Sequence, residues 1–218
     1  MLATPILAQA SFERVDTDAG TISLAITNFG VLGKPTVRNN PEGGASMRFP
    51  NDTGTEHLFE GGIWIGANYN QSGIRVSTAS VTTSGGYSRG ASGFEFTADL
   101  PITKRSTNPN NEFFSPFSVG EQDIIAEFSD RRRDINGTPI NGHDNPLYAD
   151  VKLESYNWGF PFTENFTILK YDITNNSQLY TGAAAWDSVF VGMYADLVVR
   201  NVNTATETGG AFFNKNGL

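Results

Sequence analysis

Two aspartates near the N-terminus, Asp16 and Asp18, are the clearest candidates for holding a metal ion. They alternate along Asp16-Thr-Asp18-Ala-Gly20, and closely spaced carboxylates before a glycine turn offer the oxygen ligands that calcium prefers. The third acidic ligand and the distal glutamate of an EF-hand loop are missing. The segment therefore predicts either a calcium site that distant loops complete, or a solvated turn before the first strand. No other cofactor is predicted.

Acid–base chemistry would have to use His57 or His143, the only histidines in the chain. Neither stands in a Ser-x-x-Lys, Gly-x-Ser-x-Gly or His-Glu-x-x-His pattern, so we expect both to be structural. Carboxylate pairs such as Glu56 with Glu60 would suit glycoside hydrolysis only at a separation of about 5 to 10 Å, which sequence does not give. We therefore predict no catalytic residues and no enzymatic activity.

Aromatic side chains could bind sugars, because flat rings cover the apolar faces of pyranoses. Trp158, with Tyr156, is the best candidate for such a glycan-stacking site, since Tyr156-Asn-Trp158-Gly reads as the end of a strand. Trp64 and Trp186 lie within apolar runs, where packing in the core is expected.

The charge balance argues against a polyanionic partner. The net charge is −8 with a sequence pI near 4.7, so nucleic acid would be repelled at long range. The basic run 131–133 is flanked by aspartates and reads as a solvated turn. There are no cysteines, which excludes disulfides and thiolate metal sites. No apolar run reaches the roughly 18 residues of a transmembrane helix.

Strands and turns dominate the predicted secondary structure, so these elements must position the candidate residues. In 21–27, Ile22, Leu24 and Ile26 share one face while Ser23 and Thr27 share the other, which predicts a half-buried strand. Residues 121–130 fit a helix or a strand, and we favour a strand. Turn residues between such runs, without alternating helices, predict an antiparallel β-sandwich of two packed sheets, jelly-roll or immunoglobulin-like, with long loops and about nine to eleven strands. The main predicted strands are 21–27, 58–65, 74–82, 94–98, 121–130, 149–156, 166–174 and 188–199.

The stretch 55–66, Thr-Glu-His-Leu-Phe-Glu-Gly-Gly-Ile-Trp-Ile-Gly, is the most distinctive part of the chain. Its part from Leu58 to Ile65 is apolar on both faces, as expected of a central strand. The pair Gly61-Gly62 predicts a β-bulge or a close approach of a neighbouring backbone. This segment indicates a structural role more than a catalytic one.

The two ends suggest how the chain is organised. Residues 1–10 read as the remnant of a signal peptide, with Ala8-Gln9-Ala10 matching a cleavage site, or as an apolar N-terminal arm. Residues 11–218 are predicted to form a single β-sandwich domain. The sequence stops at Leu218 without an evident terminal device, which is also expected of a domain truncated at its C-terminus.

Five motifs follow one another along the chain: Ile26-Thr-Asn-Phe-Gly30, 55–66, Ser155-Tyr-Asn-Trp158, 165–177 and Val191-Gly-Met-Tyr-Ala-Asp196. In this order they resemble the N-terminal modules of large secreted proteins of Bacteroidota and related bacteria, many of them cargo of type IX secretion. The resemblance spans roughly residues 20–196. It implies an exported, non-catalytic β-rich module at the cell surface or outside the cell. The family often has a second acidic residue after an Ala-Asp pair, where this chain has Leu197, so the resemblance does not extend to an acidic cation cluster.

Two hypotheses about function follow. The first is an extracellular structural or adhesive module, a subunit of an assembly or filament, whose partners are further copies or other surface proteins and whose apolar arm adds a strand to a neighbour. The alternative is a carbohydrate-binding domain of a secreted polysaccharide-degrading enzyme, with polysaccharide as its partner.

Overall fold

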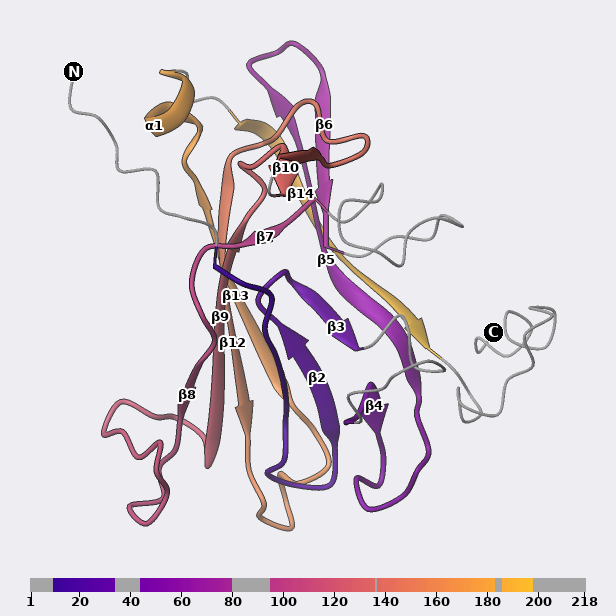
Figure 1. Cartoon of the computed structure of the whole chain (residues 1–218), viewed down its shortest axis with the longest axis vertical. Coiled ribbons are helices and arrows are strands. Elements are labelled where there is room, and N and C mark those ends of the chain that lie inside the picture. The colour runs from indigo at the N-terminus through magenta and orange to yellow at the C-terminus, as the bar shows by residue number, and fades with distance from the viewer. Residues whose placement is uncertain (1–9, 34–43, 80–94, 136, 183–185, 198–218) are drawn as a thin grey trace, which may run out of the picture.

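The chain folds into two antiparallel sheets that pack face to face, as the computed structural model shows for residues 10–33, 44–79, 95–135, 137–182 and 186–197 (Figure 1). The predicted all-β sandwich is therefore confirmed. These ranges contain fourteen strands, more than the nine to eleven expected, because several have only two or three residues. The predicted arm falls outside them except for Ala10.

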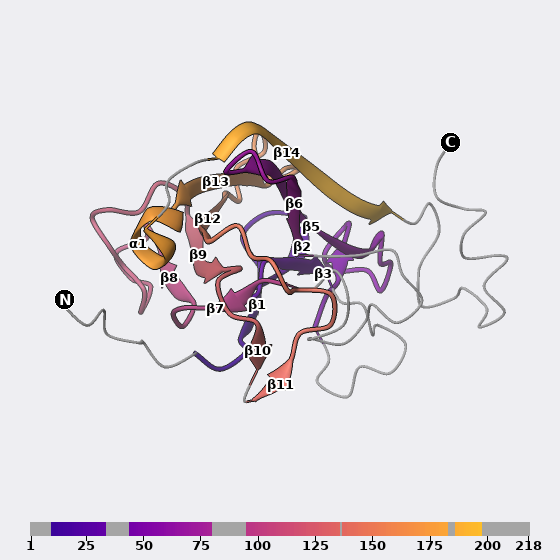
Figure 2. The same cartoon turned by 90° about the horizontal axis from the view of Figure 1, so that it is seen from above.

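The larger sheet has seven strands, and its path is β1-β2-β3-β5-β14, with β4 beside β2 and β6 beside β5. In Figure 2 this sheet lies to the right of the other, and β14 forms its upper edge. Its members are β1 (Arg14–Asp16), β2 (Ser23–Thr27), β3 (Val31–Gly33), β4 (Met47–Arg48), β5 (Leu58–Tyr69), β6 (Ile74–Thr78) and β14 (Trp186–Leu197).

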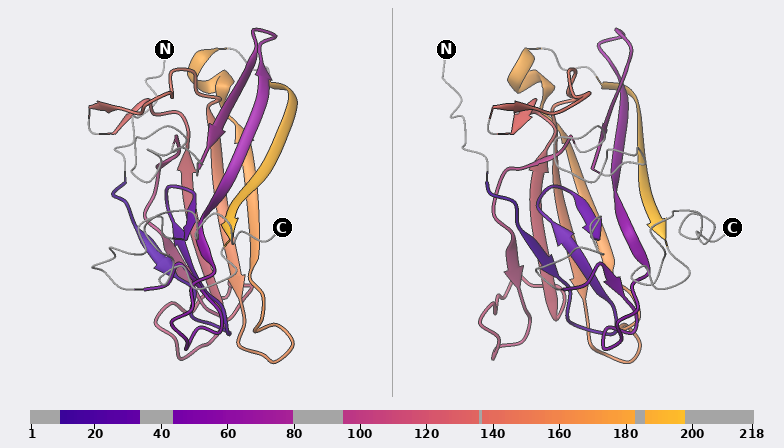
Figure 3. Two further views of the ribbon diagram at one scale, coloured as in Figure 1. Left: turned by 90° about the vertical axis from the view of Figure 1, so that its right-hand side faces the viewer. Right: turned by 45° about the vertical axis from the view of Figure 1, so that its right-hand side comes forward.

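The smaller sheet has five strands in the order β13-β12-β9-β7, with β8 also beside β9. The long strands of both sheets run along the long axis of the molecule (Figure 3). The remaining elements are a short hairpin and one helix. The members of the sheet are β7 (Thr97–Ala98), β8 (Thr103–Arg105), β9 (Gln122–Ser129), β12 (Ala149–Asn157) and β13 (Ile168–Asn175); the hairpin is β10 (Asp134–Ile135) with β11 (Thr138–Pro139), and the helix is α1 (Ser177–Thr181).

The core lies between the sheets, where alternate residues of the facing strands meet. Ile63 and Ile65 of β5 belong to the same buried cluster as Phe128 of β9 and Leu153 of β12. β9 corresponds to the segment 121–130, whose sequence pattern fits either a helix or a strand. Its prediction as a strand is confirmed, since it pairs with β12 on one side and with β7 and β8 on the other.

Two details of the larger sheet differ from expectation. β2 was expected to be half-buried, but Ala25 and Thr27 on its second face are also buried. The Thr27 hydroxyl is satisfied there because it donates to the Val31 carbonyl at 2.8 Å. Trp64, expected in the core, lies on the outer face of β5, where its ring stacks on Tyr194 with centroids 5.8 Å apart.

The Gly61-Gly62 pair accommodates a close backbone approach without a bulge. The pairing of β5 with β3 and with β14 runs through both glycines without a register shift. A Cβ on Gly61 would lie 3.1 Å from the Tyr194 carbonyl oxygen of β14. Of the two predicted alternatives, the close approach is the one observed.

Candidate ligand-binding cleft

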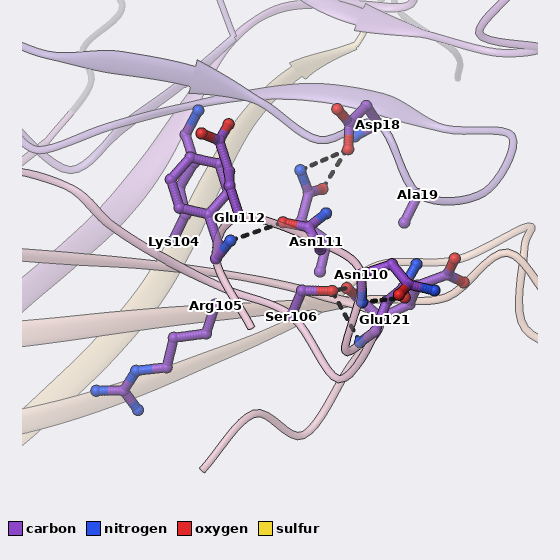
Figure 4. Close-up of a pocket in the computed structure, with 12 residues that line it drawn as sticks. Asp18, Ala19, Lys104, Arg105, Ser106, Asn110, Asn111, Glu112 and Glu121 are labelled. Carbon is purple, nitrogen blue, oxygen red and sulfur yellow. Dashed lines mark hydrogen bonds between the residues drawn. The ribbon is translucent and has the colours of Figure 1, made fainter. Parts of the chain in front are cut away.

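A polar cleft lies at the end of the sandwich where the loop from β8 to β9 meets the turn from β1 to β2. Its volume is about 630 Å³. Figure 4 shows Asp18 across from Asn110 and Glu121, with the Arg105 side chain directed away from them. The lining is formed by Asp18, Ala19, Lys104, Arg105, Ser106, Asn108, Asn110, Asn111, Glu112, Phe113, Glu121 and Gln122.

The β8–β9 loop owes its shape to short side chains that bond to nearby backbone. The Ser106 hydroxyl accepts from the Asn108 N–H at 3.1 Å, and Asn108 Oδ1 accepts from the Asn110 N–H at 2.9 Å. Asn111 Oδ1 accepts from the Phe113 N–H at 2.8 Å. Asparagine and serine favour such turns because their side chains replace backbone partners. The loop is therefore held by its own sequence.

A reciprocal pair of hydrogen bonds fixes the opposite wall. The Asp18 N–H donates to Gln122 Oε1 at 3.0 Å, and Gln122 Nε2 donates to Asp18 Oδ1 at 2.6 Å. The two residues are 104 positions apart in the sequence. This pair ties the turn before β2 to the first residue of β9, so the two sheets share one wall of the cleft.

The chemistry of the lining suits an uncharged polyhydroxylated ligand. Carboxylates such as Glu112 accept hydrogen bonds, the amides of Asn110 and Asn111 both donate and accept, and Lys104 donates. Phe113 supplies an apolar ring, and Lys104 Nζ stands 5.1 Å from its centroid. Acidic and basic groups are mixed, so the cleft does not favour a highly charged ligand of either sign.

Only one of the two predicted calcium ligands lines the cleft. Asp16 is held by Arg14, with the ion pair at 2.8 Å, and it accepts from the Ala45 N–H at 2.7 Å. Asp18 lies exposed on the wall with Gln122 as its partner. Within the described residues no group of three or more histidine, aspartate, glutamate or cysteine side chains is placed to hold a metal ion.

The predicted glycan-stacking residues lie at the same end of the molecule but outside the lining. Trp158 packs beside Phe166, with ring centroids 6.4 Å apart. The next residue, Gly159, donates its N–H to Glu121 Oε2 at 2.9 Å, and Glu121 does line the cleft. Tyr156 lies on the outer face of β12, where burial and the neighbouring Glu154 raise its pKa.

The two histidines make structural contacts. His57 Nε2 lies 3.1 Å from the Phe49 carbonyl oxygen. His143 is buried and its Nε2 bonds to the carbonyl oxygen of Asp130, not to the carboxylate. The Asp130 carboxylate accepts from the Ser77 hydroxyl at 2.5 Å and from the N–H groups of Leu147 and Ala149, each at 2.7 Å. Burial raises the pKa of Asp130, and these donors act in the opposite direction.

Sequence reasoning missed most of the cleft. Its walls come from two loops that only the folded sheets bring together, and no sequence motif predicts that these loops are neighbours. The run Asn108-Pro-Asn-Asn-Glu-Phe-Phe114 was a local signal, because asparagines that form turns stand next to aromatic residues there.

Comparison with known proteins adds no relative. The chain matches no protein-family model, no curated protein and no solved structure. No helix in the described part of the chain is long and apolar enough to cross a membrane. The fold thus defines the protein as an all-β sandwich.

Proposed function

We propose that this chain is a non-catalytic structural module of an exported bacterial surface protein and that it associates with further copies of itself. The observation that carries the proposal is the contrast between the two outer faces of the sandwich. One carries a network of ion pairs, and the other exposes several aromatic and aliphatic side chains.

The outer face of the smaller sheet carries charged side chains that suit contact with solvent. Glu154 of β12 accepts from Lys152 at 2.7 Å and from Lys170 of β13 at 2.8 Å, and Lys170 also reaches Asp172 at 2.6 Å. Such alternating charges across neighbouring strands are typical of a solvated sheet surface.

The outer face of the larger sheet is apolar along β6, β5 and β14. Val76 and Phe190 lie opposite Gly66 from its two sides, and Ile74 lies opposite Asn68. Ile74 is 78% exposed and Phe190 71%. Contiguous exposed apolar surface is typical of protein interaction sites, which supports association through this face.

Measuring the mass of the full chain in solution across a concentration series, by sedimentation velocity or light scattering, tests the proposal. We expect association in the unmodified protein and its loss in Phe190→Glu, which places a charge on the apolar face. Thr174→Glu adds the same charge to the outer face of β13 and should leave association unchanged. A monomer at every concentration up to the solubility limit would refute the proposal.

Removing residues 1–10 tests the arm separately. If the arm adds a strand to a neighbour, its deletion abolishes the assembly, whereas association through the apolar face of the larger sheet survives the deletion.

The cleft favours a second candidate function, the binding of a neutral glycan. Amides and carboxylates beside one aromatic ring are the usual means of holding sugar hydroxyls and a sugar face. On a glycan array, Phe113→Ala should abolish binding while Trp158→Ala leaves it intact. Loss of binding in Trp158→Ala alone would favour the stacking site predicted from sequence. A chain that binds no member of the array does not have this function.

A further inference from the structure

The last strand, β14, is an edge of the larger sheet whose central stretch lacks charges and proline. Among the described residues it pairs only with β5. Its ladder is regular from Phe190 to Asp196, with irregularities at both ends of that stretch. An exposed edge strand can pair with another chain, and edge strands therefore normally carry charges or proline that prevent such pairing. Residues 190–195 carry neither.

The inward face of β14 extends beyond the area that the smaller sheet covers. Val191 lies opposite Ile65 and Met193 opposite Ile63, so each pair points to the same side of the sheet. Ile65 and Ile63 are 0% and 1% exposed, yet Val191 and Met193 are 57% and 51% exposed. The smaller sheet therefore covers β5 but leaves β14 in contact with solvent on its apolar side.

The sequence of this edge is a chemical palindrome centred on Gly192. Val191 and Met193 flank the glycine, and Phe190 and Tyr194 flank that pair. When two antiparallel copies of a strand pair about a two-fold axis, each residue meets the one equally distant on the other side of the centre. Valine would then face methionine on the inner side, and phenylalanine would face tyrosine on the outer side.

The remaining features of the edge agree with this register. An ideal Cβ on Gly192 would meet no heavy atom within 4 Å, so the backbone there is open to a close neighbour. Aromatic rings on either side of a sheet glycine can close over it. The two Asp196 carboxylates would lie at opposite ends of the paired segment, so like charges do not oppose each other.

We infer that β14 is the pairing edge of a two-fold dimer in which Gly192 of one copy meets Gly192 of the other. The two seven-stranded sheets then form one continuous sheet, and the apolar face described above becomes continuous across the axis. The inference rests on the proposed self-association and assigns it to one strand, one register and a second copy of this chain.

A single introduced cysteine tests the register, because the chain has none of its own. Gly192→Cys places two thiols on the axis, at the Cβ separation of directly opposed residues, which is close enough for a disulfide. Under mild oxidation we expect a covalent dimer from Gly192→Cys and none from Thr174→Cys on the exposed edge strand β13. Circular dichroism confirms that both variants fold.

A charge introduced on the β14 edge tests how much this contact contributes to the stability of the dimer. Val191→Lys should raise the dissociation constant of the dimer by more than about tenfold, which corresponds to about 1.4 kcal/mol, because a lysine cannot be buried against methionine without a partner. The variant keeps its fold, since position 191 is half-exposed in the monomer.

The outcomes separate this inference from the proposed function. Association of the unmodified chain without a Gly192→Cys cross-link, or association that survives Val191→Lys, would overturn the β14 dimer and leave self-association standing. Assembly that disappears on deletion of residues 1–10, with no cross-link at position 192, would overturn it in favour of a donated strand. A chain that is monomeric throughout refutes both.

Discussion

Single buried residues hold the loops of this sandwich through hydrogen bonds to backbone. Asp130 is the clearest case, because its two carboxylate oxygens satisfy the backbone N–H groups of Leu147 and Ala149 and the hydroxyl of Ser77. It fixes the start of β12 against the end of β9.

Asp130→Asn should therefore lower the free energy of unfolding by about 1–3 kcal/mol, because an amide N–H₂ would face a donor in a buried site. Urea unfolding followed by tryptophan fluorescence measures the change. Ser77→Ala removes one donor and keeps the carboxylate, so its effect should be smaller. Equal stability of Asp130→Asn and the unmodified protein would contradict this role.

Glu154 makes stability depend on acid pH. Burial raises its pKa, but Lys152 and Lys170 outweigh burial and hold the pKa at about 2, below the value of about 4.3 expected in the unfolded chain. Stability contributed by Glu154 is therefore complete above the unfolded pKa and is lost as pH falls toward 2.

Replacing Glu154 with Gln should lower the free energy of unfolding by about 1 kcal/mol near neutral pH, since the flanking lysines are partly exposed and solvent screens them. The difference from the unmodified protein should vanish between about pH 4.5 and pH 2. Unfolding curves at several pH values measure it, with Asp144→Asn as a control, because Asp144 is an exposed carboxylate outside this ion-pair network. A difference that does not depend on pH would rule out the ion pairs as its cause.

At the scale of elements, close contacts between the sheets depend on glycines in turns. Gly30, in the turn between β2 and β3, has φ of +78° and lies against the ring of Phe128 in β9. A Cβ there would lie 2.7 Å from the ring edge. The turn between β2 and β3 therefore reaches the other sheet only because position 30 lacks a side chain.

Gly30→Ala should cost about 1–3 kcal/mol beyond the backbone penalty, because it overpacks the core. Gly137 provides a matched control, since its φ is +82° and no atom lies within 4 Å of its Cβ position. Gly137→Ala carries the backbone penalty alone. Thermal unfolding of both variants separates the two contributions, and equal losses of stability would show that packing against Phe128 is unimportant.

The strands were largely predictable and the cleft was not, for reasons visible in particular residues. Alternating apolar residues placed β2, and the apolar run at 58–65 placed β5, because burial imposes a period of two or a continuous apolar run. Helix α1 was not predicted, since five residues are too few for a helical period. The Asp18–Gln122 contact depends on the packing of two sheets, which no local pattern specifies.

At the scale of the whole molecule, charge and association oppose each other. The chain carries −8, so copies repel at long range, whereas the proposed contact at residues 190–194 is uncharged. Raising the salt concentration from about 0.1 M to about 1 M shortens the Debye length from roughly 10 to 3 Å. We expect tighter self-association at high salt, measured by sedimentation equilibrium. Weaker association at high salt would indicate an interface held by ion pairs instead.

The pairing of β14 with β5 also has a consequence for when the protein can fold. Tyr69 at the end of β5 pairs with Trp186 at the start of β14, so more than half of the chain must emerge before that edge of β5 gains its neighbour. Pairings this distant in sequence form slowly. Until then one edge of this long, largely apolar strand remains open to misassembly. Substitutions that weaken β14 should therefore first reduce the yield of folded protein, before any property of the finished molecule changes.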